Sequence, residues 1–297
     1  MALKATPPPG MHRAMVPGGV VEYREYGAAE APPLLFVHGV LANERLWEAV
    51  AQRLAPHYRC ILPTWPLGAH RLAMRPDADL SPPGMVEQIV AFMDALRLPR
   101  ATLIGNDSGG ALCQMLLARH PQRVERLVLT SCDAYEIWLP LLFKYLEYAA
   151  FVPGMLWLLA QLLRLRPLRR LPIAFGWLVK RMPRDLADAL TAPMAASSGV
   201  RRDLGKFLRG ISARYTLQAA HSFAGFRAPV LIAWSRQDRF FPLTHARRLQ
   251  QHFPQARLML VDDAYTFSAI DNPGQLAQHL EVFLHDSAAS MADKVLA

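Results

Sequence analysis

Residues 103–110, LIGNDSGG, contain two side chains that could attack a substrate atom. An apolar run at 101–106 ends directly before Asp107 and Ser108, and a helical pattern follows at once. A turn this tight between a strand and a helix holds its apex residue in a strained conformation, with the side chain raised at the carboxyl end of the sheet. A carboxylate or a hydroxyl in that position could act as a nucleophile.

The spacing of small residues distinguishes the two candidates. Crowding in such a turn requires small residues two positions before and two positions after the apex. With Asp107 at the apex, Gly105 and Gly109 meet both conditions. With Ser108 at the apex, the preceding position would be occupied by Asn106 instead of a small residue. The pattern therefore predicts that Asp107 is the apex residue.

Strand and helix patterns alternate along most of the chain, which predicts a mostly parallel sheet with helices on both faces. Strands are predicted at 20–27, 34–39, 58–64, 101–106, 126–132, 229–235 and 257–263. Helices are predicted at 43–54, 82–96, 108–120, 243–253 and 273–284.

The alternation is interrupted between residues 134 and 227, where only helical and loop patterns occur. We therefore predict a core of residues 1–133 and 228–297, with residues 134–227 inserted as a helical cap. The cap carries 14 Lys and Arg against 5 Asp and Glu, so it accounts for the whole net charge of +9. This charge fits either a solvated basic face or a surface for peripheral contact with a membrane or lipid-like substrates. No nucleic-acid-binding motif accompanies it.

The composition indicates a globular protein, with 52% hydrophobic and 19% charged residues among 297. Cys60, Cys113 and Cys132 all lie in apolar segments, which favours free buried thiols in a reducing compartment and hence a cytoplasmic location. Residues 1–10 lack the apolar stretch of a signal peptide and are expected to form a loose terminus. The chain shows no metal-ligand spacing and no phosphate-binding loop, so we expect no metal and no cofactor.

Four segments together resemble the α/β-hydrolase fold family, in order and in spacing, over about residues 20–284. They are LLFVHGV, LIGNDSGG, PVLIAWSRQDRFFP and VDDAYTFSAIDNPGQLAQHLEVFL. The resemblance implies a mostly parallel eight-stranded sheet, a nucleophile elbow at LIGNDSGG and a cap over the site. An Asp at the elbow is similar to the branch of epoxide hydrolases and haloalkane dehalogenases.

The same resemblance assigns a role to each matching residue. Asp107 would attack carbon and form an alkyl ester, which water then hydrolyses through a tetrahedral intermediate. The backbone N–H groups of Val40 and Ser108 would stabilise the oxyanion of that second step. Asp238 would orient the catalytic histidine. His38, which precedes the oxyanion turn, is expected to be a turn residue.

The catalytic histidine is the departure from the family pattern. The resemblance places Tyr265 and Thr266 in that turn, with Thr266 at the histidine position. A threonine hydroxyl has no useful pKa for a general base near neutral pH. His70, after the strand at 58–64, is the best substitute by its expected place in the sheet. Asp263 is a further candidate if burial raises its pKa.

The expected substrate is bulky and apolar, because the cap is rich in Leu, Phe, Trp and Met. A dehalogenase of this branch uses a Trp after the nucleophile and an Asn after His-Gly, and these positions are Ser108 and Val40 here. Dehalogenation is therefore disfavoured. An epoxide hydrolase uses cap tyrosines as proton donors, and the cap offers four candidates. They are Tyr135, Tyr145, Tyr148 and Tyr215.

Three functions stay open from the sequence. The first is a cofactor-independent, epoxide-hydrolase-like enzyme that works through Asp107. The second is a lyase, isomerase or cyclase of the same fold, because an ester on Asp107 would not be hydrolysed efficiently without the histidine. The third is a ligand-binding member that has lost catalysis. The oligomeric state is also open.

Overall fold

A computed structural model describes residues 10–296 and contains one eight-stranded sheet, with the strand order β1-β2-β4-β3-β5-β6-β7-β8. In this sheet β2 pairs antiparallel with both β1 and β4. Every other neighbouring pair is parallel. The strands are β1 (Met11–Val16), β2 (Gly19–Tyr26), β3 (Pro33–Val37), β4 (Arg59–Pro63), β5 (Ala101–Asp107), β6 (Val124–Cys132), β7 (Val230–Ser235) and β8 (Ala256–Val261). The seven predicted strands are confirmed to within two residues, whereas β1 was not predicted.

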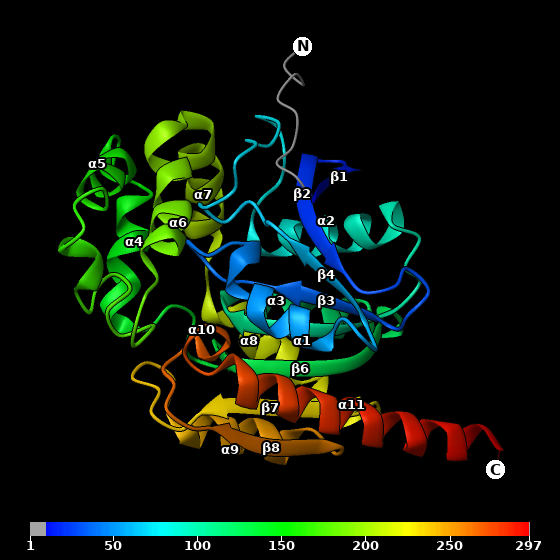
Figure 1. Cartoon of the computed structure of the whole chain (residues 1–297). Helices are drawn as coiled ribbons and strands as arrows, with labels where there is room; N and C mark the ends of the chain where they lie inside the picture. The colour runs from blue at the N-terminus through cyan, green and yellow to red at the C-terminus, as the bar shows by residue number, and fades with distance from the viewer. Residues whose placement is uncertain (1–9, 297) are drawn as a thin grey trace.

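Helices cover both faces of the sheet (Figure 1). The helices of the core are α1 (Glu48–Leu54), α2 (Pro82–Ala95), α3 (Ser108–Arg119), α8 (Ala213–Ala220), α9 (Leu243–His252), α10 (Ser268–Asp271) and α11 (Pro273–Leu296). The first and last of them, α1 and α11, pack together on one face, and α2, α3 and α8 pack in a row on the other. This architecture confirms the predicted fold class.

The inserted segment contributes four further helices, which gather at one end of the molecule (Figure 1). They are α4 (Lys144–Ala149), α5 (Met155–Leu162), α6 (Arg184–Ala196) and α7 (Ser198–Gly210). The backbone N–H of Phe267, in the loop after β8, donates to the carbonyl oxygen of Leu178 at 2.8 Å, which ties this cap to the carboxyl end of the sheet. Because α8 packs against α3, the last part of the predicted cap range covers the sheet instead of the site.

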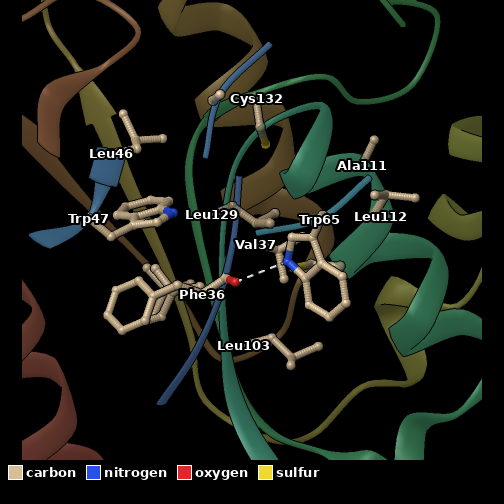
Figure 2. Close-up of a cluster of buried hydrophobic side chains, with 14 of the residues drawn as sticks. Phe36, Val37, Leu46, Trp47, Trp65, Leu103, Ala111, Leu112, Leu129 and Cys132 are labelled. Atoms are coloured by element: carbon tan, nitrogen blue, oxygen red, sulfur yellow. Dashed lines mark hydrogen bonds between the residues drawn. The ribbon is translucent and has the colours of Figure 1, made fainter. Parts of the chain in front are cut away.

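A tightly packed core lies beneath the carboxyl ends of the central strands (Figure 2). Val37 of β3, Leu103 of β5 and Leu129 of β6 are fully buried next to one another. The indole N–H of Trp65 donates to the carbonyl oxygen of Phe36 at 3.2 Å, so the loop after β4 is fastened to β3. Close packing of this kind resists small displacements, and it gives the loops above it a rigid base. All three cysteines are buried free thiols, as predicted.

No helix within residues 10–296 combines the length and the apolar character needed to cross a membrane. The segment predicted to be a loose terminus comprises residues 1–10. All of it except Gly10 lies outside the described part of the chain.

Candidate active site

Asp107 occupies the apex of the turn between β5 and α3, with φ 53° and ψ −134°. Positive φ is uncommon for a residue with a side chain and marks a strained position. A Cβ atom on Gly105 would lie 2.7 Å from Cα of Gly110, and one on Gly109 would overlap the carbonyl oxygen of Val37. The turn therefore needs both glycines, which is the reason that the predicted spacing identified the apex correctly.

The side chain of Asp107 reaches a pocket that is otherwise apolar or aromatic. The other lining residues are Val40, Leu41, Leu139, Phe143, Tyr145, Leu146, Leu163, Ala174, Phe175 and Leu178. About 30 Å³ of this pocket is open to the centres of water molecules, which is room for about two of them. A bulky substrate can therefore enter only if the cap residues move. The pocket has one carboxylate on an apolar wall, the composition expected of a site for an apolar ligand with one reactive group.

Three carboxylates gather at the ends of neighbouring strands: Asp107 ends β5, Asp133 follows β6 and Asp238 follows β7. Asp107 and Asp133 are buried, and Asp238 is half-buried. Burial raises the pKa of Asp107 well above its ordinary value, and the negative charge of Asp133 raises it further. The backbone N–H of Ser108 opposes this shift by donating to the Asp107 carboxylate. The site is thus an acidic cluster in which protons are held more tightly than in water.

Asp133 is fully buried, and burial raises its pKa to about 7. Its carboxylate accepts hydrogen bonds from the Ser108 hydroxyl at 3.0 Å and from the backbone N–H of Leu139 at 2.9 Å. These two donors favour the charged form but do not cancel the effect of burial. Asp133 is therefore positioned to exchange a proton near neutral pH.

Asp238 lies beside Thr266. Its Oδ1 atom accepts from the backbone N–H groups of Phe240 at 2.7 Å and Phe241 at 2.8 Å, and from the Thr266 hydroxyl at 3.2 Å. Its Oδ2 atom is buried and has no hydrogen-bond partner among residues 10–296. Burial raises the pKa of Asp238. The oxygen without a partner can accept a proton or a hydrogen bond, although no imidazole stands next to it.

The backbone next to the carboxylate has the arrangement expected of an oxyanion site. Val40 lines the pocket, and its N–H has no protein acceptor among the described residues. A Cβ atom on Gly39 would overlap the Asp107 carboxylate, so only glycine lets this backbone lie so close to the Asp107 side chain. His38 is buried, accepts from the backbone N–H of Trp65 at 2.8 Å, and has its pKa lowered to about 4 by burial. It is a neutral turn residue, as expected.

His70 does not take the place of the missing base. It is absent from the pocket lining, and its Nε2 lies 3.2 Å from the carboxylate of Asp203 on α7. The backbone N–H of Gly68 donates to its other ring nitrogen at 3.4 Å. Because both nitrogens have partners outside the pocket, His70 connects the loop after β4 to the cap and has no access to the reacting groups.

The proposal that burial raises the pKa of Asp263 is wrong. Its carboxylate is 82% exposed and pairs with Lys180, and this pairing lowers its pKa. The neighbouring Asp262 pairs with Arg236 at 2.5 Å, with the same effect on its pKa. Tyr265 does not line the pocket, and the guanidinium of Arg239 lies 4.7 Å from its ring centroid.

Two polar residues near the site, Asp133 and Asn106, are not predicted from the sequence. Asp133 follows a predicted strand directly, so its place at the carboxyl end of the sheet could have been predicted from the sequence. The side-chain amide of Asn106 donates to the carbonyl oxygens of Thr130, Ser131 and Thr266, so it fastens the elbow to the loop that carries Thr266. No sequence motif indicates this role of Asn106. Within residues 10–296, no group of three His, Cys, Asp or Glu side chains could hold a metal ion.

Among the four cap tyrosines, Tyr145 alone lines the pocket. Its hydroxyl donates to the carbonyl oxygen of Ile173 at 2.7 Å, and burial raises its pKa to about 12. Tyr135 packs among core side chains, Tyr148 is 72% exposed, and the hydroxyl of Tyr215 bonds Arg214. The structure therefore reduces four candidates for a proton donor to one.

Comparison with known proteins bears on the fold and the family of this chain. A family described as "alpha/beta hydrolase fold" matches residues 32–273. A cis-3-alkyl-4-alkyloxetan-2-one decarboxylase from Shewanella oneidensis is 25% identical over 91% of this chain and 86% of its own length. A haloalkane dehalogenase from Mesorhizobium japonicum is 35% identical over 42% of this chain and 41% of its own length. The solved structure of a haloalkane dehalogenase loop variant from Bradyrhizobium elkanii covers 96% of this chain and 99% of its own, with a TM-score of 0.79 and 19% identity, a likeness of fold.

Proposed function

The chain belongs to the α/β-hydrolase fold family, and from that premise we propose that it is a cofactor-independent hydrolase that opens a strained cyclic ether, such as an epoxide, through Asp107. One observation carries the proposal: a carboxylate at a strained apex forms the single charged group of an otherwise apolar pocket. The matched relatives include hydrolases, which supports the reaction class.

In the first step, an Oδ atom of Asp107 attacks a ring carbon. A carbon–oxygen bond of the ring breaks, its electron pair passes to the ring oxygen, and an ester forms on Asp107. The carboxylate must be ionised to attack, and its raised pKa makes this ionisation dependent on pH. Burial also removes the water that would otherwise solvate the nucleophile.

The opened ring oxygen needs a proton, and Tyr145 is the donor that we propose. It is the cap tyrosine of the pocket, and its hydroxyl already donates to a backbone carbonyl 2.7 Å away. Rotation of that O–H toward the substrate oxygen would deliver the proton as the ring opens. The contact with Ile173 would then be exchanged for a contact with substrate.

In the second step, water attacks Cγ of the Asp107 ester. The backbone N–H groups of Val40 and Ser108 stabilise the oxyanion, and its collapse breaks the bond to the product oxygen. Asp238 accepts one proton from the attacking water, because its Oδ2 atom is buried without a partner and its pKa is raised. The product oxygen takes the remaining proton of the added water and leaves as the alcohol, so Asp107 is returned as a carboxylate. The proton that Asp238 takes up restores the Tyr145 hydroxyl. A carboxylate is a weaker base than imidazole, so we expect this release step to limit turnover.

Dehalogenation is less well supported. A departing halide needs N–H donors, and neither Trp nor Asn lines the pocket in the described residues. Ser108 and Val40 occupy the positions that such donors take in the dehalogenase branch.

A second candidate is a lyase or isomerase acting on a similar strained ring. The buried contact of Thr266 with Asp238 favours it, because a site without an imidazole is poorly equipped for ester hydrolysis. One relative is named as a decarboxylase of an alkylated oxetanone, which is itself a strained ring. In this candidate, the substrate would rearrange or fragment without taking an oxygen from water.

A mass-spectrometry experiment tests the proposal. The enzyme is mixed with epoxides that carry alkyl chains of increasing length, and its intact mass is then measured. We expect an adduct with the mass of the substrate, on the peptide that contains Asp107, before product appears. Absence of both adduct and product across the series would rule out the epoxide proposal. Product formed without an adduct, and without the added mass of a water molecule, would favour the lyase or isomerase.

A further inference from the structure

The outer side of the cap exposes large apolar side chains in an unusual concentration. We define the cap outer face by Phe151, Trp157, Leu158, Leu162, Leu165 and Ile173, which are between 40% and 65% exposed. Three of them belong to α5, which lies at the edge of the molecule away from the sheet (Figure 1). Large apolar side chains left exposed together in one segment of the cap indicate an interaction site.

The segment that carries this face is strongly basic, although Asp188 on α6 pairs with Arg166 and Arg169. Residues 148–184 contain seven Lys and Arg and no Asp or Glu. Arg164, Arg166, Arg170, Arg181 and Arg184 are exposed. Among the described residues, Arg170, Arg181 and Arg184 have no ion-pair partner, and they line a groove beside Phe175. These cations are therefore available to an anionic surface.

We propose that the cap outer face docks on a bilayer that contains anionic phospholipids. Trp157, Leu158 and Leu162 would enter the boundary between headgroups and acyl chains, and the arginines would bind lipid phosphates. Segments that combine an apolar face with arginines and a tryptophan bind membrane interfaces in this way. Charge complementarity favours this occupant over a second copy of the chain, whose own cap would bring the same positive charges together.

The docking surface also forms the roof of the catalytic pocket. Leu162 is exposed on the outer face while its neighbour Leu163 lines the pocket. Ile173 is exposed in the same way, and Ala174 and Phe175 line the pocket. In both places one layer of residues separates the pocket from the outer face. An apolar molecule dissolved in the bilayer would therefore meet the pocket roof directly.

Co-sedimentation of the full chain with vesicles tests the proposal without any turnover, so its failure would not affect the proposed chemistry. We compare vesicles of phosphatidylcholine alone with vesicles that also contain phosphatidylglycerol, each at low and high salt. We expect at least about tenfold stronger binding to the anionic vesicles, weakened by salt because free ions screen the exposed charges. Equal binding to both compositions, or no binding to either, would overturn the proposal.

Two variants identify the surface. Reversing charge with Arg170→Glu, Arg181→Glu and Arg184→Glu is expected to weaken binding at least about 100-fold, since each arginine near the surface contributes about fivefold. Trp157→Glu with Leu158→Glu should also abolish binding. The matched controls carry Val282→Glu, an exposed apolar position on α11, or Arg100→Glu with Arg247→Glu, and they should bind as the unchanged protein does.

Unchanged melting temperatures would show that the variants are folded. If both cap variants bind anionic vesicles like the controls, the cap outer face is not the docking surface. If vesicles do not bind and the protein instead forms dimers that Trp157→Glu with Leu158→Glu dissociates, the face is a contact between copies and the membrane proposal is wrong.

Discussion

The Ser108 hydroxyl donates a 3.0 Å hydrogen bond to the carboxylate of Asp133, while the Ser108 backbone N–H donates to Asp107. One residue thus connects the proposed nucleophile to a second buried acid. Since each carboxylate disfavours the ionisation of the other, the protonation of Asp107 depends on Asp133.

Asp133→Asn should move the pH dependence of adduct formation on Asp107 to lower pH. Removal of the neighbouring negative charge lowers the pKa of Asp107, so the attacking carboxylate ionises in more acidic solution. Single-turnover rates of adduct formation between pH 4 and 9 measure this shift. An unchanged profile in the folded variant would show that Asp133 does not influence the nucleophile.

The stability of the protein should also depend on Asp133. The pKa of this group in the folded protein is about 7, above its ordinary value of 3.8, so the folded form binds the proton more tightly than the unfolded form does. Its contribution to stability is therefore complete below about pH 4 and is lost as the pH rises through 7. Relative to the unchanged protein, Asp133→Asn should gain about 1–3 kcal/mol between pH 5 and pH 8 in denaturant unfolding. A constant difference across this range would contradict the assignment.

Asp107→Asn should abolish the adduct and stabilise the fold. Asn tolerates positive φ and carries no charge, so the variant keeps the turn and removes a buried carboxylate from an acidic cluster. We expect a gain of about 1–3 kcal/mol in the free energy of unfolding at pH 8, with ligand binding retained. If the variant still forms product at the original rate, Asp107 is not the nucleophile.

Tyr145→Phe should slow ring opening by about 100-fold or more, because the developing alkoxide loses its proton donor. Loss of the hydrogen bond to Ile173 should cost only about 1 kcal/mol in stability. Tyr148→Phe, at an exposed position on the same helix, is the matched control. Equal rates for the two variants would remove Tyr145 from the mechanism.

Thr266→His should accelerate decay of the adduct, by about 100-fold or more, because an imidazole beside Asp238 supplies the general base that the site lacks. Thr266→Val keeps the shape without the hydroxyl, whose hydrogen bond lowers the pKa of Asp238. Its loss should therefore move the pH dependence of the decay to higher pH. Stopped-flow mixing followed by quenching and mass measurement gives the decay rates. If a folded Thr266→His variant releases product no faster, base catalysis is not what limits release.

The sequence predicted the fold well because alternating strands and helices leave clear apolar patterns. The strand β1 was harder to predict, since its six residues, MHRAMV, lie at the edge of the sheet and mix polar with apolar side chains. The elbow was predictable because steric crowding restricts the residues around Asp107 to glycine. Its identification needed only local spacing.

The rest of the site depends on contacts between distant segments. Nothing in the residues around Asp133 shows that Ser108 binds it, and nothing around Asn106 shows that its amide reaches the loop of Thr266. The candidates His70 and Asp263 were plausible by their places in the chain. Their partners, Asp203 and Lys180, come from the cap, and the packing of the cap on the core decides their roles.

The proposed mechanism requires that an ester forms on Asp107 and that water hydrolyses it by attack at its carboxyl carbon. A single-turnover experiment tests this requirement directly. An excess of enzyme is mixed with an apolar epoxide in water labelled with heavy oxygen. The peptide that contains Asp107 should gain one heavy oxygen, and the product of that first turnover should gain none. Heavy oxygen in the product with an unlabelled Asp107 would contradict the proposed mechanism, because water would then have attacked the substrate itself.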